Sequence, residues 1–132
     1  MLIYNDEMII LKDKEDEKED KKKLEIYNTK RKIVREMNKL EFELANVGVQ
    51  YIIETILLIK SNDTLYNLEK DIYPLVAKKY NVSTNRVKWN ICSCVNSMYK
   101  NNNMSNINEY FGYEFNRRTT PKTLIFTILN KI

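Results

Sequence analysis

Several residue types are absent or scarce in this 132-residue sequence, and each shortage narrows the choice of fold and chemistry. There is no histidine, which excludes a zinc site built from cysteine and histidine and also excludes acid–base catalysis by imidazole. Only two glycines and two prolines are present, too few for a sheet with many tight turns. The composition therefore predicts an all-α protein.

The two cysteines, Cys92 and Cys94, also offer little chemistry. On a helix, residues two apart point about 200° apart, so these thiols can neither bridge each other nor share a metal ion. We expect two unpaired thiols and no metal. The sequence has no Gly-rich phosphate loop and no nucleophile motif, which predicts a protein that is not an enzyme, with no catalytic residues and no cofactor.

Long hydrophobic runs are missing as well. No run approaches the ~20 apolar residues of a membrane span. The N-terminus carries Asp6 and Glu7 where a signal segment would be cationic and then apolar. We expect a cytoplasmic protein with no membrane partner.

Charge is present in quantity and is unevenly distributed. The net charge is +4. Residues 1–50 hold 11 basic and 12 acidic residues, whereas residues 51–132 hold 11 and 6. A basic C-terminal part is the expected footprint of phosphate binding. The alternative is a lysine-rich composition without a nucleic-acid partner.

The N-terminal segment differs from the rest of the chain. Residues 1–11 predict either a small hairpin or a frayed extension of a helix. Residues 12–23, KDKEDEKEDKKK, contain no apolar residue and indicate a solvated linker or an exposed helix. We therefore divide the chain into an N-terminal arm with a charged linker, 1–23, and a helical domain, 24–132.

Helical periodicity begins at Leu24 and continues in a series of segments. The first apolar stripe favours a helix packed on its own domain; its members are Ile26, Ile33, Met37, Leu40 and Leu44. Gly48 is expected to break this pattern. Residues 50–61 are apolar almost all round, which predicts a buried central helix. Later segments predict a helix that becomes regular at Tyr73-Pro74, a short helix ending at Gly112 and a last helix starting near Pro121.

Residues 77–91, AKKYNVSTNRVKWNI, are typical of a helix-turn-helix. Leu75, Val76 and Tyr80 are expected to face inward on the first helix, and Ala77 is small enough for a close crossing. Asn81-Val82 forms the expected turn, and Ser83 or Thr84 can cap the second helix. One apolar face is expected on that helix, made of Val87, Ile91, Cys94, Val95 and Met98.

The opposite face of the second helix is the candidate for reading bases in DNA. At about 100° per residue, Trp89 points almost directly away from the apolar face. The candidate base-reading residues are Asn85, Lys88, Trp89 and Cys92, and the candidate phosphate contacts are Lys78, Lys79, Ser83, Thr84, Arg86 and Ser93. Trp89 has three alternative roles: direct DNA contact, an anchor for another protein, or packing against another segment such as the arm.

Four segments in order along residues 44–132 carry a resemblance to a known family. They are GVQYIIETILLI, IYPLVAKKYNVSTNRV, NMSNINEYFGYEF and PKTLIFTILNKI. In them the chain resembles the C-terminal DNA-binding effector domain of the sporulation response regulator, stage 0 sporulation protein A. The block from Tyr73 to Val87 and the Phe111-Gly112-Tyr113 triplet are the most specific parts. The resemblance implies a compact bundle of about six helices that contains the helix-turn-helix.

The same resemblance implies transcription regulation through double-stranded DNA, with a homodimer or a head-to-tail tandem dimer on direct repeats. Two departures stand out. About 43 residues precede the resembling part, too few for the family's receiver domain, so we expect its aspartyl-phosphate switch to be missing. The family's recognition helix continues from Arg-Val with Glu-Arg and then Arg-His, whereas here Arg86 and Val87 are followed by Lys88, Trp89, Cys92 and Ser93.

Two hypotheses of different classes follow. In the first, the protein is a DNA-binding transcription regulator, related to sporulation, with altered recognition residues and a new target sequence. In the second, it no longer reads DNA and is an interaction module whose partner is a full-length relative or another regulator. The basic excess favours the first hypothesis, and Trp89 with Cys92 on the reading face favours the second.

Overall fold

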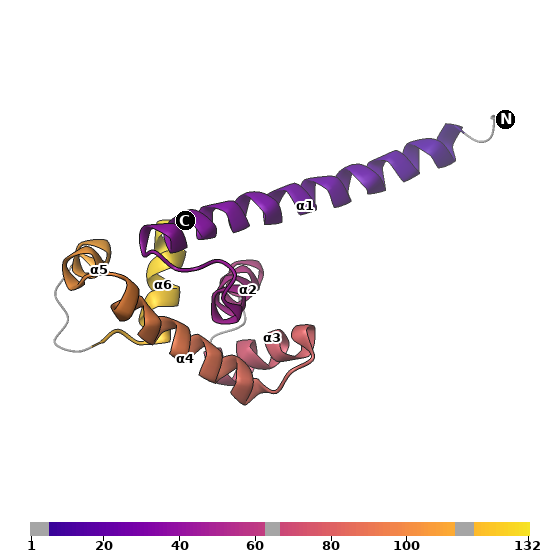
Figure 1. Ribbon diagram of the computed structural model, residues 1–132. Coiled ribbons are helices and arrows are strands. Elements are labelled where there is room, and N and C mark those ends of the chain that lie inside the picture. Colours follow the sequence, from indigo (N-terminus) through magenta and orange to yellow (C-terminus); the bar gives the residue numbers. More distant parts are fainter. Residues whose placement is uncertain (1–5, 63–66, 113–117) are drawn as a thin grey trace.

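The computed structural model of the chain describes residues 6–62, 67–112 and 118–132, and within these ranges it contains helices and no strands (Figure 1). This confirms the all-α prediction. Six α-helices and one π-helical segment follow one another: α1 (Asp6–Lys39), α2 (Val47–Ser61), η1 (Leu68–Ile72), α3 (Tyr73–Tyr80), α4 (Thr84–Asn101), α5 (Met104–Phe111) and α6 (Pro121–Lys131).

Helix starts follow from the abundance of asparagine, serine and threonine in the sequence. The side chains that cap the first turns of α2, η1, α4, α5 and α6 are Asn46, Asn67, Ser83, Asn103 and Thr120. Each accepts a hydrogen bond from a backbone N–H that the helix itself leaves unpaired. Helix α3 begins instead with Pro74 in its first turn, as predicted, since proline needs no N–H partner there.

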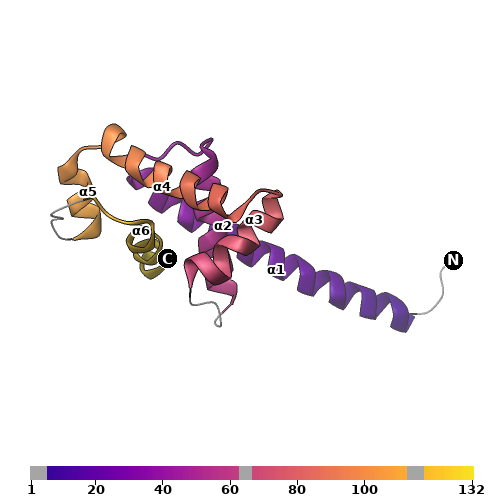
Figure 2. The same ribbon diagram turned by 90° about the horizontal axis from the view of Figure 1, so that it is seen from below.

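Helix α2 is the centre of the domain, as its apolar sequence predicts. It contacts α1 on one side and α3 and α4 on the other, and α6 packs against both α2 and α4 (Figures 1 and 2). The buried apolar side chains of these helices form one core. The apolar face predicted for α4 is confirmed, because all five of its members are buried in this core. Leu124, Ile125 and Ile128 of α6 also lie in this core, whereas Leu129 is only half-buried.

Helix α1 is longer than the pattern of apolar residues indicated. It runs without a break across residue 23, so of the two forms considered for residues 12–23 the structure has the helix. Its outer turns extend away from the other helices (Figures 1 and 2). Only the last part of the predicted stripe, Ile33, Met37 and Leu40, is buried. Ile26 lies on the outer turns and is exposed, and Leu44 lies beyond the end of the helix and is also exposed. Residues 1–5 lie outside the described ranges.

A polar contact ties the inner end of α1 to α5. The Glu36 carboxylate is buried, accepts a hydrogen bond from the Tyr110 hydroxyl at 3.1 Å and pairs with Lys39 at 2.8 Å. Burial and the adjacent Glu36 carboxylate raise the pKa of Tyr110 above its ordinary value, so this hydroxyl stays protonated and remains a donor. A buried carboxylate requires such partners to offset its loss of hydration.

The prediction for the inward face of α3 was partly wrong. Val76 and Ala77 are buried, together with Tyr73, but Leu75 and Tyr80 are exposed. The helix has only eight residues, so its buried face consists of the residues that follow Tyr73 by three and four positions. Tyr80 at the end of the helix rests edge-on against Tyr51, with ring centres 5.1 Å apart. Leu75 falls outside this buried face of α3 and is therefore directed outward.

Gly48 was expected to break the helical pattern, but it lies in the first turn of α2. Its role is a close approach to α4. A Cβ atom at this position would lie 2.6 Å from the Cβ of Cys94 and closer still to the backbone carbonyl oxygen of Asn90. No side chain fits there without moving α4, which explains the glycine better than a helix end does.

We predict that Gly48→Ala destabilises the protein by about 1–3 kcal/mol, because the added methyl group meets backbone that cannot turn aside. The free energy of unfolding from urea denaturation followed by circular dichroism measures this. Gly112→Ala is the matched control: its φ of 81° makes alanine unfavourable, but the added Cβ would meet no atom within 4 Å among the described residues. It should cost only about 1–2 kcal/mol and leave the packing of α4 intact. Unchanged stability of Gly48→Ala would contradict the close approach.

Candidate nucleic-acid interface

The turn between α3 and α4 is built by three consecutive residues. Asn81 adopts the left-handed conformation, φ 54° and ψ 49°, which asparagine tolerates better than most residues. The Val82 N–H then donates to the Ala77 carbonyl oxygen at 2.9 Å and closes the end of α3. The Ser83 hydroxyl accepts from the Arg86 N–H at 3.1 Å and starts α4. Of the two residues considered for this cap, Ser83 is therefore the one that serves.

Helices α3 and α4 pack against each other through residues that are small or fully buried. Ala77 of α3 and Val87 of α4 both lie in the core. Helix α4 is thereby held with its apolar face against α2 and its opposite face toward solvent. Helix α3, the turn and α4 thus form two contacting helices joined by a tight turn at the surface of the bundle, in the order that a helix-turn-helix has (Figure 1).

The solvent face of α4 carries the residues predicted to read bases, but they do not all share one environment. Asn85 is exposed, and Trp89 is the most exposed large apolar side chain among the described residues, with 69% of its surface open. This contradicts the alternative in which Trp89 packs against another segment. Lys88 and Cys92 are only half-exposed and lie at the edge of the face that turns toward α6.

Two of the predicted DNA contacts are already paired within the protein. The ammonium group of Lys79 lies 2.9 Å from a carboxylate oxygen of Glu54, a half-buried residue of α2. The ammonium group of Lys88 lies 3.0 Å from a carboxylate oxygen of Glu69 in η1. Neither acidic partner was identified from the sequence, because both come from elements distant along the chain and no local pattern indicates the contact.

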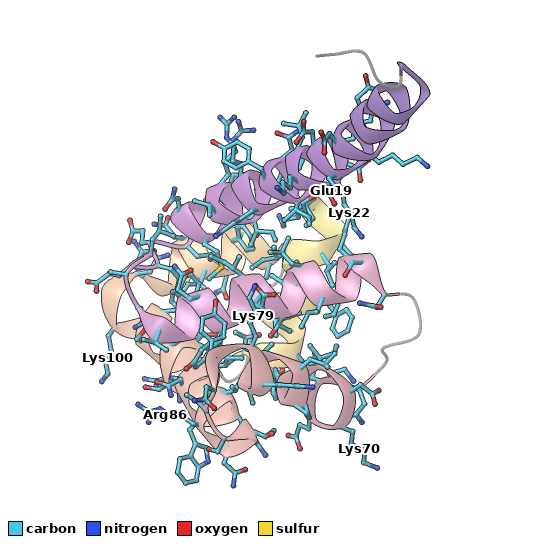
Figure 3. The ribbon with its side chains drawn as sticks, turned by 90° about the vertical axis from the view of Figure 1, so that its right-hand side faces the viewer. Glu19, Lys22, Lys70, Lys79, Arg86 and Lys100 are labelled. Carbon is cyan, nitrogen blue, oxygen red and sulfur yellow. The ribbon has the colours of Figure 1, made fainter. Side chains whose placement is uncertain are left out.

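The remaining predicted phosphate contacts fall into two groups. Lys78 and Arg86 are exposed and form no ion pair within the described residues, and Arg86 projects away from the helices (Figure 3). Ser93 is exposed on the next turns of α4. Thr84 is half-buried, and the hydroxyl of Ser83 is engaged as the helix cap. Among the predicted phosphate contacts, Lys78 and Arg86 are therefore the cations best placed to meet an external anion.

The two thiols differ although both are free. Cys94 is buried in the core, and burial raises the pKa of its thiol to about 12, so it stays protonated and acts as a small apolar side chain. Cys92 is half-exposed at the edge of the reading face.

No helix among the described residues is long and apolar enough to cross a membrane.

Two helices joined by a tight turn at the surface of a helical bundle are the arrangement that DNA-binding proteins of the helix-turn-helix class share. Residues 33–132 match the family described as "Sporulation initiation factor Spo0A C terminal". The match covers most of the chain, and the chain belongs to this family of DNA-binding sporulation-regulator domains, which is not an enzyme family. The matched range begins within α1, at the point where this helix meets the core.

We predict that Trp89 fluorescence in the free protein is quenched readily by iodide, because the side chain is open to solvent. Trp89 is the only tryptophan, so the signal has one source. The quenching constant should approach that of N-acetyltryptophanamide under the same conditions. A strongly protected Trp89 would mean that another copy of the chain, or another segment, covers the reading face.

Proposed function

We propose that the protein is a DNA-binding transcription regulator, related to sporulation, that reads DNA through α4 with recognition residues different from those typical of the family. The observation that carries the proposal is the solvent face of α4, where exposed Asn85 and Trp89 lie beside Arg86 and Lys78, two cations with no ion pair among the described residues. The basic excess of residues 51–132 supports the same proposal.

The first turns of α4 are the part that would enter the major groove. Asn85 can pair with adenine through two hydrogen bonds, and its exposure leaves both amide atoms available. Arg86 and Lys78 flank the helix start and suit phosphates on either side of the groove. The Ser83 hydroxyl contributes by fixing the start of α4 rather than by meeting a phosphate.

Lys88 can reach guanine only if it leaves Glu69. Both side chains of this pair are substantially exposed, and such pairs contribute about 0–1 kcal/mol, so exchange for a base is inexpensive. Trp89 offers one donor and a large apolar surface, and Cys92 can meet only a thymine methyl group. These candidate base-reading residues differ from the Glu and Arg residues of the family's recognition helix. The preferred DNA sequence should therefore differ from the family's repeat.

The alternative function is an interaction module that pairs with a full-length relative or another regulator and does not read DNA. The observation that favours it is Trp89, because an exposed tryptophan is a frequent anchor in protein interfaces. The same surface can also serve a homodimer or a tandem dimer on DNA.

We predict salt-sensitive binding to double-stranded DNA. Each neutralised phosphate should contribute about −0.9 to the slope of log affinity against log salt concentration. Fluorescence anisotropy with labelled duplex at several salt concentrations measures the slope, and unlabelled family repeat and scrambled duplex should compete equally well. Arg86→Gln should weaken binding and reduce the slope by about one phosphate.

Lys32→Gln is the matched control, since it removes the same charge from α1 on the other side of α2 (Figure 1). It should leave the affinity and the slope nearly unchanged. Absence of binding even at low salt would exclude DNA reading and leave the interaction module.

We predict that Trp89→Ala separates the two functions. If Trp89 contacts DNA, the variant loses affinity for its selected site, and its sedimentation behaviour is unchanged. If Trp89 anchors another protein, self-association or partner binding weakens by about 2 kcal/mol or more while DNA affinity is retained. The selected site comes from binding of the pure protein to genomic fragments followed by sequencing. Loss of neither activity would remove Trp89 from both proposals.

A further inference from the structure

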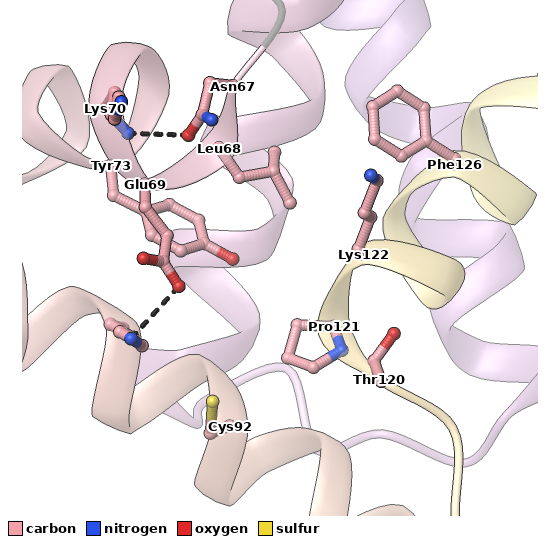
Figure 4. Close-up of a pocket in the computed structure, with 11 residues that line it drawn as sticks. Asn67, Leu68, Glu69, Lys70, Tyr73, Cys92, Thr120, Pro121, Lys122 and Phe126 are labelled. Atoms are coloured by element: carbon pink, nitrogen blue, oxygen red, sulfur yellow. Dashed lines mark hydrogen bonds and ion pairs between the residues drawn. The ribbon is translucent and has the colours of Figure 1, made fainter.

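A groove of about 390 Å³ lies beside α4, between η1, the start of α3 and the start of α6 (Figure 4). Its volume falls in the range of sites for small organic ligands. Leu68, Pro121 and Phe126 supply apolar walls from two sides, and Tyr73, Lys88, Cys92 and Lys122 supply polar atoms. The groove adjoins the solvent face of α4, because Lys88 and Cys92 at the edge of that face line it, whereas Asn85 and Trp89 do not.

The Tyr73 hydroxyl is the most informative atom in the groove. Only 3% of this residue is exposed, and the hydroxyl has no hydrogen-bond partner within the described part of the chain. Figure 4 shows it directed into the open space between η1 and α6. The hydroxyl itself is not one of the fully buried atoms and opens onto the groove, so it is available there to a hydrogen-bond partner on an external ligand.

Tyr73 remains a hydrogen-bond donor over the physiological range of pH. Burial raises its pKa to about 12, with smaller contributions from Cys92 and Glu69. A protonated phenol suits an acceptor atom on the ligand, such as a carboxylate or phosphate oxygen.

The N-terminus of α6 supplies hydrogen-bond donors and partial positive charge for an anionic group in the groove. Thr120 caps the Thr123 N–H, and Pro121 has no N–H. The Lys122 N–H is thus left without a partner in the described ranges, at the positive end of the helix dipole. The Lys122 side chain forms no ion pair there either, and Figure 4 shows its ammonium group between Phe126 and Leu68, within the groove.

The charges around the groove also favour an anion. Lys70, Lys88 and Lys122 line it together with one carboxylate, that of Glu69. The carboxylate is neutralised by Lys88 at 3.0 Å. The remaining ammonium groups leave the groove with a positive excess beside an apolar wall.

We propose that this groove binds a small anionic ligand with an apolar body, an aromatic or aliphatic phosphate or carboxylate. The anionic group meets the Tyr73 hydroxyl and the backbone and side-chain nitrogens of Lys122. The apolar body packs on Leu68, Pro121 and Phe126. This proposal does not rest on DNA binding, because the groove is complete in the free chain.

The test is a nuclear magnetic resonance titration of the full ¹⁵N-labelled chain, without DNA, with phenyl phosphate as the probe. We expect saturable 1:1 shifts centred on the Lys122 amide, with affinity about tenfold higher than for inorganic phosphate, since the ring adds buried apolar surface. Shifts that do not saturate, or equal affinity for the two anions, would overturn the proposal.

Two variants make the test specific. Tyr73→Phe keeps the ring and removes the hydroxyl, and Lys122→Ala changes an exposed side chain, so each should fold. Each should weaken phenyl phosphate binding by about tenfold, the usual effect of losing a hydrogen bond to a charged group. Lys100→Ala, at the far end of α4, is the control and should bind normally. Normal binding by both groove variants would sink the proposal even if phenyl phosphate binds.

A DNA phosphate offers the same anionic chemistry, and a final titration separates the two sources. Phenyl phosphate that still binds in the presence of saturating duplex supports a free small ligand. Displacement by duplex would assign the site to the DNA backbone and overturn the small-ligand proposal. Because the main titration contains no DNA, its result is independent of whether the protein reads DNA.

Discussion

The close packing of α2 against α4 at Gly48 is the constraint on which the rest of the domain depends. Helix α2 is the centre of the core, and the missing side chain lets the backbone of α4 lie directly on its first turn. This contact fixes the direction of the face that carries Asn85 and Trp89, and it also fixes the edge that carries Lys88 and Cys92. One contact thus determines what α4 shows to solvent and what it contributes to the groove beside α6.

Ion pairs divide the basic residues of the helix-turn-helix into those held by the protein and those left for a partner. Lys79 and Lys88 are held by Glu54 and Glu69, whereas Lys78 and Arg86 are not paired in the described ranges. Counting lysines and arginines therefore overstates the charge available to DNA on this surface. Of the two acidic partners, Glu54 is largely buried and holds Lys79 more firmly than the exposed Glu69 holds Lys88.

The features that could be predicted from the sequence are those set by local geometry. A period of 3.6 residues gave the apolar face of α4 and the outward direction of Trp89, and the chemistry of Ser83 and Pro74 gave two helix starts. Features set by contacts between distant elements could not be predicted. Three features each need two or three elements that the fold brings together: the close approach at Gly48, the pairing of Lys88 with Glu69 and the groove around Tyr73. The outward position of Leu75 depends on the residue at which α3 begins.

The unbroken length of α1 has a mechanical consequence. Its inner turns are part of the core through Ile33 and Met37, while its 34 residues give a rod of about 50 Å at 1.5 Å per residue. Because α1 is fixed to the core at one end, its helical geometry sets both the distance and the angular position of its outer turns. Insertion of one residue into its outer turns would swing everything beyond the insertion by about 100° around the axis, whereas seven residues would nearly restore the original phase.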